Sequence, residues 1–99
     1  MFYQHGDVII AEIEAEKVCG EVQPHLILEE GEVTGHMHRV TSGEAQLLVD
    51  GGRKFLRART TVVVSHEEHK PITLPPGQYE ITRVKEYDPF EDVVRNVGD

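Results

Sequence analysis

The sequence lacks the residues on which several common classes of protein depend. Its only cysteine is Cys19, so neither an intramolecular disulfide nor a cysteine-rich metal site can form within one chain. Tryptophan is absent, and three tyrosines with three phenylalanines provide no ladder of aromatic rings for stacking bases. The longest uninterrupted apolar run has four residues, Val8–Ala11, whereas a membrane-spanning helix needs about 20. We therefore expect no membrane segment.

Basic residues are scarce relative to acidic ones. Ten lysines and arginines stand against 18 aspartates and glutamates, a formal net charge of −8. Such a chain repels polyanions, which disfavours nucleic acids as partners. No basic segment followed by an apolar stretch occurs in the first residues, MFYQHGDVIIAEIEAEK, so we expect no secretory signal and a cytoplasmic location.

The composition, 38% apolar and 28% charged, is that of one small globular domain over residues 1–99. Turn signals recur at short intervals, among them Asp50-Gly51-Gly52, a strong hairpin signal. Between them we expect strands over residues 8–13, 25–29, 36–41, 45–49, 54–59, 61–65 and 78–87. The strict alternation over 78–87 suggests a strand near a sheet edge or half exposed. The sequence predicts an all-β fold, a small antiparallel β-barrel or sandwich.

Two alternatives stay open for the end of the chain. Asp88 can cap a short helix that begins at Pro89, with Glu91 completing a capping-box-like arrangement. Apolar residues then follow at helical spacing: Phe90, Val93, Val94 and Val97. Because valine favours helices poorly, the alternative is an extended tail that pairs with another chain. An apolar tail on so small a β domain also favours a homodimer or a higher homo-oligomer.

Two histidines carry the strongest chemical signal. His36 and His38 are two residues apart on a predicted strand, so both side chains point to the same face. Glu44 follows the next turn and offers a carboxylate, while His66 and His69 each offer a further imidazole from a loop after the strand at 61–65. Imidazole and carboxylate ligands together predict a site for a divalent metal ion such as zinc, iron, manganese or nickel.

The alternative is that these histidines are structural or surface residues, as we expect for His5 and His25. The segment His66-Glu67-Glu68-His69 is not the metalloprotease motif H-E-x-x-H, which has its histidines four apart on a helix. Here they are three apart, and Pro71 follows closely. No serine–histidine–aspartate order or phosphate-binding glycine loop predicts a different catalytic mechanism.

The region around these histidines resembles the first motif of the cupin superfamily, G-x5-H-x-H-x3,4-E-x6-G, whose histidines and glutamate ligate a metal. The matching residues are Gly31, His36, His38, Glu44 and Gly51, with the first two gaps one residue off. Pro75-Pro76-Gly77 resembles the opening of the second motif, P-x-G-x2-H-x3-N, but Glu80 stands where that motif has a histidine. The resemblance implies a small β-barrel with a ligand pocket and a fourth metal ligand from His66, His69 or Glu80.

The leading hypothesis is a small metal-binding, cupin-like protein that acts on or senses a small molecule, with Tyr79 and Glu80 lining the ligand pocket. The second hypothesis is a non-catalytic binding or assembly module on an oligomeric β scaffold, with a peptide, nucleotide or RNA ligand. Whether the protein is an enzyme stays open at this stage.

Overall fold

The computed structural model describes residues 2–30 and 35–84. Within these ranges the chain is almost entirely strands and turns, with one short 3-10 helix, η1 (Ala15–Lys17). The strands are β1 (Phe2–His5), β2 (Val8–Ile13), β3 (Glu21–Val22), β4 (Ile27–Glu30), β5 (Met37–Ser42), β6 (Ala45–Asp50), β7 (Arg53–Ala58), β8 (Val62–Ser65), β9 (Ile72–Leu74) and β10 (Gly77–Arg83).

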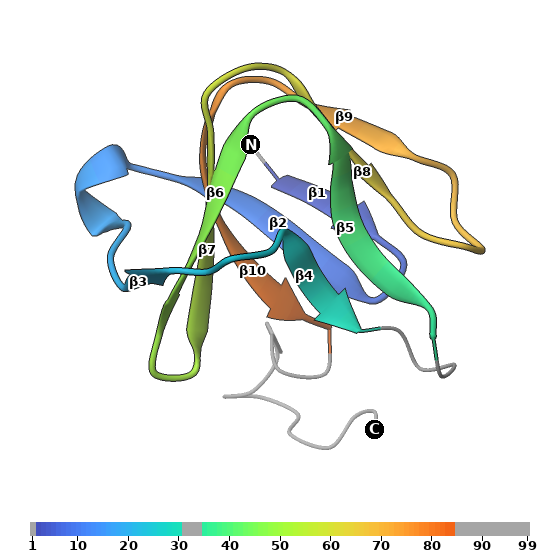
Figure 1. Ribbon diagram of the computed structural model, residues 1–99, viewed down its shortest axis with the longest axis horizontal. Coiled ribbons are helices and arrows are strands. Elements are labelled where there is room, and N and C mark those ends of the chain that lie inside the picture. The colour runs from blue at the N-terminus through green and yellow to red at the C-terminus, as the bar shows by residue number, and fades with distance from the viewer. Residues whose placement is uncertain (1, 31–34, 85–99) are drawn as a thin grey trace, which may run out of the picture.

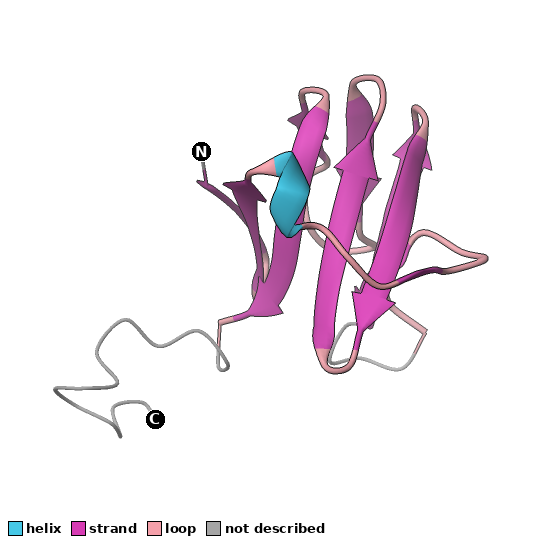
Figure 2. Cartoon of the chain, turned by 90° about the vertical axis from the view of Figure 1, so that its left-hand side faces the viewer, coloured by secondary structure: helices cyan, strands magenta, loops and turns pink. Residues whose placement is uncertain are grey.

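The strands form two antiparallel sheets (Figures 1 and 2). The larger sheet has the order β1-β2-β10-β7-β6-β3, and the smaller sheet has the order β4-β5-β8-β9. Among the described residues no ladder joins an edge strand of one sheet to an edge strand of the other. The prediction of an all-β, antiparallel fold is confirmed, but the sheets do not close into a barrel.

The main core lies between the two sheets. Alternate residues of the larger sheet, such as Val8 and Ile10 of β2, face buried residues of the smaller sheet, such as Leu28, Val62 and Leu74. This alternation follows from the two-residue period of a strand. A second, smaller cluster forms where Phe55, Leu48 and Val18 pack together, with Val18 supplied by the segment that follows η1. Part of the outer face of the larger sheet is therefore also covered by apolar side chains.

Most predicted strands are present, with boundaries shifted by one or two residues. The strand at Val8–Ile13 is confirmed as predicted, and the hairpin at Asp50-Gly51-Gly52 joins β6 to β7. The short strands β1, β3 and β9 were not predicted. Of the two alternatives for this strand, an edge position is wrong, because β10 pairs with β2 on one side and with β7 on the other. A half-exposed strand is what the structure has, since Tyr79 and Ile81 are buried and the other residues of β10 are half-buried. The alternatives for residues 88–97 lie outside the described residues.

The described part of the chain contains no helix of the length and apolar character needed to cross a bilayer.

Candidate metal centre

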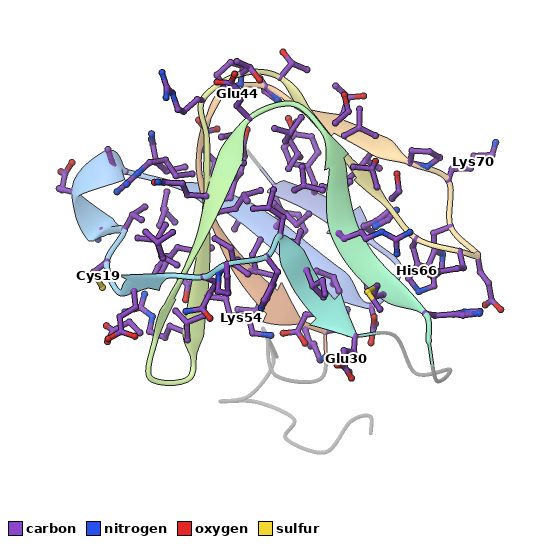
Figure 3. All side chains as sticks on the ribbon, viewed as in Figure 1. Cys19, Glu30, Glu44, Lys54, His66 and Lys70 are labelled. Carbon is purple, nitrogen blue, oxygen red and sulfur yellow. The ribbon has the colours of Figure 1, made fainter. Side chains whose placement is uncertain are left out.

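Five of the six histidines gather at one place in the fold. His5 ends β1, His38 lies in β5 and His36 stands just before it, while His66 and His69 belong to the loop between β8 and β9. We call these five residues the histidine cluster. Neighbouring rings have centroid separations from 4.3 Å, between His38 and His66, to 6.3 Å, between His5 and His66. The cluster therefore joins residues from both sheets, and His66 in Figure 3 marks its position beside β5 and β8.

The turn between β1 and β2 brings the larger sheet up to the cluster. Gly6 has a φ of +64°, which glycine adopts without strain. A Cβ atom at Gly6 would lie 2.6 Å from His69 Nε2 and 3.1 Å from His38 Cε1. Only a residue without a side chain allows the backbone to approach these two rings so closely. The turn also places His5 and Asp7 on either side of this approach.

His5 and His38 are hydrogen-bonded to one another in the interior. Their Nδ1 atoms are 3.0 Å apart, and His5 Nε2 lies 2.8 Å from the carbonyl oxygen of Lys70. Both residues are buried, with 2% and 1% of their surface exposed. Burial, followed by the nearby His66 and His5 rings, lowers the pKa of His38 to about 4. Burial also lowers the pKa of His5, so both rings are neutral near pH 7 and suited to bind a metal ion.

A carboxylate faces the other ring nitrogen of His38. Asp7 Oδ1 lies 3.5 Å from His38 Nε2. The second oxygen, Asp7 Oδ2, lies 3.6 Å from Arg83 Nη1, and it is buried without a hydrogen-bond partner among the described residues. Asp7 therefore stands between an imidazole nitrogen and a guanidinium group.

Another set of ligand atoms lies on the loop side of the cluster. His36, His66 and Glu67 each offer one ligand atom, and these atoms lie within 4.8 Å of one another. His36 Nδ1 is buried without a hydrogen-bond partner among the described residues and lies 3.6 Å from Glu68 Oε2. Donor atoms that share one tetrahedral zinc ion lie about 3.4 Å apart, so only a pair near the 4.8 Å limit has to come closer, by at most about 1.4 Å.

Glu67 is held in place as a carboxylate. Its Oε1 accepts a hydrogen bond from the Met37 backbone N–H at 3.0 Å, and its Oε2 accepts one from Arg39 Nη1 at 3.2 Å. The Met37 N–H, the Glu67 N–H and the Arg39 guanidinium lower the pKa of Glu67 to about 2. The carboxylate is therefore ionised at every pH at which His38 is neutral.

The structure brings together four of the predicted metal ligands, His36, His38, His66 and His69, but it places Glu44 elsewhere. Glu44 follows β5, at the far end of that strand from Met37, and its backbone N–H donates to Thr60 Oγ1 at 2.9 Å. An extended strand rises about 3.3 Å per residue, so the six residues from His38 separate the two by roughly 15–20 Å. Figure 3 shows Glu44 above the β5–β6 turn, well away from His66.

The two predicted pocket residues, Tyr79 and Glu80, point to opposite faces of β10. Tyr79 is 1% exposed in the main core, and its hydroxyl donates to the carbonyl oxygen of Pro75. Glu80 accepts hydrogen bonds from Arg53 at 3.1 and 3.2 Å on the other face. Adjacent residues of a strand cannot line one pocket on one face, and neither residue belongs to the histidine cluster.

Three residues of the cluster and its surroundings were not predicted: His5, Asp7 and Glu67. The available signal was the two aromatic residues Phe2 and Tyr3, followed closely by Gly6-Asp7, which together indicate a strand and a two-residue hairpin turn. Recognising that hairpin indicates that His5 and Asp7 flank a tight turn. It does not indicate that the turn lies against β5, because that contact depends on how the two sheets pack.

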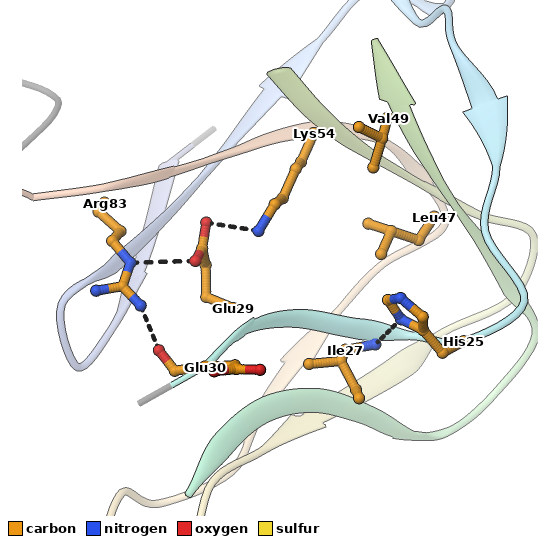
Figure 4. A pocket seen from close by; sticks show the side chains of 8 residues that line it. All are labelled: His25, Ile27, Glu29, Glu30, Leu47, Val49, Lys54 and Arg83. Atoms are coloured by element: carbon orange, nitrogen blue, oxygen red, sulfur yellow. Dashed lines mark hydrogen bonds and ion pairs between the residues drawn. The ribbon is translucent and has the colours of Figure 1, made fainter. Parts of the chain in front are cut away.

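A cavity of about 410 Å³ lies between the sheets at the Glu30 end of β4 (Figure 4). Glu29 bridges two cations there, with Oε2 2.9 Å from Lys54 Nζ and Oε1 3.1 Å from Arg83 Nε. Arg83 also donates to the carbonyl oxygen of Glu30 and, through Asp7, connects the cavity with the histidine cluster. The lining residues are His25, Ile27, Glu29, Glu30, Leu47, Val49, Lys54 and Arg83.

Comparisons with known proteins identify a family for this chain but no activity. Neither the search of curated proteins nor the search of solved structures finds a match to this chain. One family model, described as a domain of unknown function (DUF8820), matches residues 4–84, which include the whole histidine cluster, Asp7 and the cavity. The chain therefore belongs to the DUF8820 family.

Proposed function

We propose that this protein binds a divalent transition-metal ion at the histidine cluster. The observation that supports the proposal best is the meeting of ligand atoms from His36, His66 and Glu67 within 4.8 Å, beside three further imidazoles. Two imidazoles and one carboxylate are a common protein ligand set for zinc, iron, manganese and nickel.

The surroundings favour a metal ion over a cluster of hydrogen-bonded histidines alone. Beside the proposed ligands, burial lowers the pKa of His5 and of His38, so these two rings carry no positive charge near pH 7 that would repel a cation. The Met37 N–H and Arg39 hold Glu67 as an oriented carboxylate, as residues around a metal ligand do. Three protein ligands leave a coordination position for water or for a small molecule.

The resemblance to cupins supports the same type of chemistry with one exchange of ligand. Glu67 from the β8–β9 loop takes the role that the cupin motif assigns to Glu44 in this sequence. The metal then lies near the β8–β9 loop and the start of β5, and its ligands His66 and Glu67 lie outside the two cupin-like segments.

Metal content of untagged protein tests the proposal. The protein is loaded with zinc, cobalt or nickel, dialysed and analysed by mass spectrometry of the elements. We expect at least one equivalent per chain, and we expect the double variant His36→Gln/His66→Gln to lose at least tenfold in affinity. Cobalt adds an absorption spectrum that reports nitrogen and oxygen coordination.

His25→Gln is the matched control, because His25 is the histidine outside the cluster. It is expected to bind as much metal as the wild type. Circular dichroism in the presence of a chelator checks that each variant folds. Wild-type protein without bound metal under every loading condition, or an equal loss in His25→Gln, contradicts the proposal.

The cavity favours small-molecule binding as a second candidate function. Ile27, Leu47 and Val49 form an apolar wall, and Lys54 stands at its charged end. Lys54 Nζ has three N–H groups and meets two acceptors among the described residues, the carboxylate of Glu29 and the carbonyl of Leu28. The remaining N–H suits a ligand that joins a carboxylate to an apolar body.

Calorimetric titration with butyrate, hexanoate and octanoate tests this second function. Binding is expected to strengthen with chain length, because each buried CH₂ contributes about 0.8 kcal/mol, and to weaken in Lys54→Met. Lys17→Met in η1 is the control. Equal binding by Lys54→Met, or no heat with any of the three acids, argues against a carboxylate site.

A further inference from the structure

Four polar groups form a row through the histidine cluster. The row runs from the Lys70 carbonyl to His5, then to His38, and then to the carboxylate of Asp7. The three separations are 2.8 Å, 3.0 Å and 3.5 Å. Both ends of the row are hydrogen-bond acceptors, so three donors are needed to fill three gaps. Two neutral imidazoles carry one N–H each, which leaves one gap without a hydrogen.

The geometry identifies the gap that lacks a hydrogen. The Lys70 carbonyl can only accept, so the proton of His5 is on Nε2 and its Nδ1 has a lone pair. His38 must then donate from Nδ1 to His5, which leaves the lone pair of His38 Nε2 directed at Asp7 Oδ1. This gap is the longest of the three. Two lone pairs facing one another repel unless a cation lies between them.

The separation fits a metal ion. Zinc bonds to imidazole nitrogen and carboxylate oxygen are about 2.0–2.2 Å long, which holds the two ligand atoms about 3.4 Å apart in tetrahedral coordination. The observed distance between His38 Nε2 and Asp7 Oδ1 is 3.5 Å. A third proton fills this gap less well, because it makes an imidazolium of a ring that is 1% exposed and surrounded by other imidazoles.

The outer contacts of this pair are those of a metal site. A histidine ligand usually donates its other N–H to a fixed acceptor, and here His5, itself anchored on Lys70, accepts it. Asp7 Oδ2 is buried without a hydrogen-bond partner among the described residues, with Arg83 Nη1 3.6 Å away. His69 Nε2 also lies on this side, 2.6 Å from the position that a Cβ at Gly6, next to Asp7, would take.

We infer that Asp7 and His38 bind a second divalent metal ion, beside the ion at His36, His66 and Glu67, so that the cluster is a two-metal centre. Each half contains one of the two buried side-chain atoms that lack a hydrogen-bond partner among the described residues, Asp7 Oδ2 and His36 Nδ1. His66 lies between the halves, with its ring 4.3 Å from that of His38 and 5.6 Å from that of His36. This inference rests on the proposed metal-binding function.

Counting ions per chain tests it. Full-length untagged protein is titrated with zinc in a calorimeter, and its metal content is measured after dialysis. We expect two equivalents for the wild type, one for Asp7→Asn and one for Glu67→Gln. Copper-loaded protein adds a second readout: two nearby copper(II) ions broaden each other's electron paramagnetic resonance signal, and the broadening is expected to disappear in Asp7→Asn.

The possible counts separate the two proposals. One equivalent in the wild type that Asp7→Asn retains and Glu67→Gln loses overturns the second site and leaves the proposed function standing. No equivalent in the wild type overturns both. Two equivalents in both wild type and Asp7→Asn also contradict the assignment of Asp7.

Matched variants show whether the loss of one ion is specific to Asp7. Asp50→Asn removes a carboxylate at a different hairpin and is expected to keep two equivalents, as is His25→Gln. Asp7→Ser serves as a second variant in case Asp7→Asn folds poorly, and it too is expected to bind one equivalent.

Discussion

Two glycines at hairpin turns show how one residue determines whether the histidine cluster can form. Gly6 and Gly51 have nearly the same φ, +64° and +62°. A Cβ at Gly51 would meet nothing within 4 Å, whereas one at Gly6 would lie 2.6 Å from His69 Nε2. Both substitutions to alanine strain the backbone, by about 1–2 kcal/mol. Because of the added clash, we expect Gly6→Ala to lower the free energy of unfolding by about 2–5 kcal/mol in total.

Chemical denaturation of both variants in a chelator measures the difference. The comparison cancels the backbone strain that the two turns share, so the excess at Gly6 reports the close approach of the rings. Equal losses of stability in Gly6→Ala and Gly51→Ala contradict this account. Metal affinity is expected to fall in Gly6→Ala only.

The hydroxyl of Tyr79 predicts a dependence of stability on alkaline pH. Burial, and then Tyr3 and Glu12, raise the pKa of Tyr79 to about 12. A group whose pKa is higher in the folded state stabilises the fold fully below its unfolded pKa of about 10 and loses that contribution as the pH rises to about 12. Between those pH values we expect the free energy of unfolding to fall by about 1–3 kcal/mol more in the wild type than in Tyr79→Phe.

Denaturant unfolding at several pH values from 9 to 12 provides the test. At pH 7 Tyr79→Phe is expected to be about 1 kcal/mol less stable, because the Pro75 carbonyl loses its donor. Lysine titration affects both proteins alike and cancels in the difference. Parallel pH curves for the two proteins contradict the prediction.

At the scale of elements, Glu29 ties the smaller sheet to the larger one. It lies on β4, and its two cationic partners, Lys54 and Arg83, lie on β7 and β10. The carboxylate is 13% exposed. Removing the carboxylate leaves two partly buried cations facing one another. Because both cations keep some contact with solvent, we expect Glu29→Gln to lower the free energy of unfolding by about 1–3 kcal/mol.

Glu80→Gln is the control for Glu29→Gln. Glu80 also pairs with an arginine, Arg53, but within one sheet and with Arg53 58% exposed. An exposed pair of this kind contributes less than about 1 kcal/mol. Equal effects of the two substitutions in thermal unfolding contradict a special role for the link between sheets.

At the scale of the whole molecule, the histidine cluster is a second link between the sheets. His5 and Asp7 come from the β1–β2 hairpin of the larger sheet, and the other histidines come from β5 and the β8–β9 loop of the smaller one. A metal bound there binds the folded chain and not the unfolded one. At a free metal concentration 100 times Kd this stabilises the fold by about 2.7 kcal/mol.

Thermal unfolding with and without zinc measures this coupling. For a domain of this size we expect the midpoint to rise by roughly 10–20 °C at 100 times Kd and to fall back when a chelator is added. The variant His36→Gln/His66→Gln is expected to show at most half of that rise. An unchanged midpoint in wild-type protein at saturating zinc contradicts a metal that binds the folded chain in preference to the unfolded one.

The local pattern predicted elements better than it predicted their neighbours. Alternation and turn residues identified Val8–Ile13 and the β6–β7 hairpin, since both depend on residues close in sequence. The same pattern led to an edge position for β10, although β2 and β7 flank it. Alternation along a strand indicates which of its faces is buried, but it does not indicate which strands pair with it. Edge strands as short as β3 and β9 contain too few residues for a period to show.

Some features of the histidine cluster follow from local sequence alone, and others depend on how the strands and sheets pack. Spacing of two along a predicted strand indicates that His36 and His38 face the same side. The structure places both in the histidine cluster, although β5 begins only at Met37. Glu67 lies beside the histidines because β8 pairs with β5 inside the smaller sheet, whereas His5 and Asp7 reach them because one sheet packs on the other. The contact of His5 with His38, 33 positions apart, depends on the energy of burying the facing sides of both sheets at once, and no local run of residues contains that information.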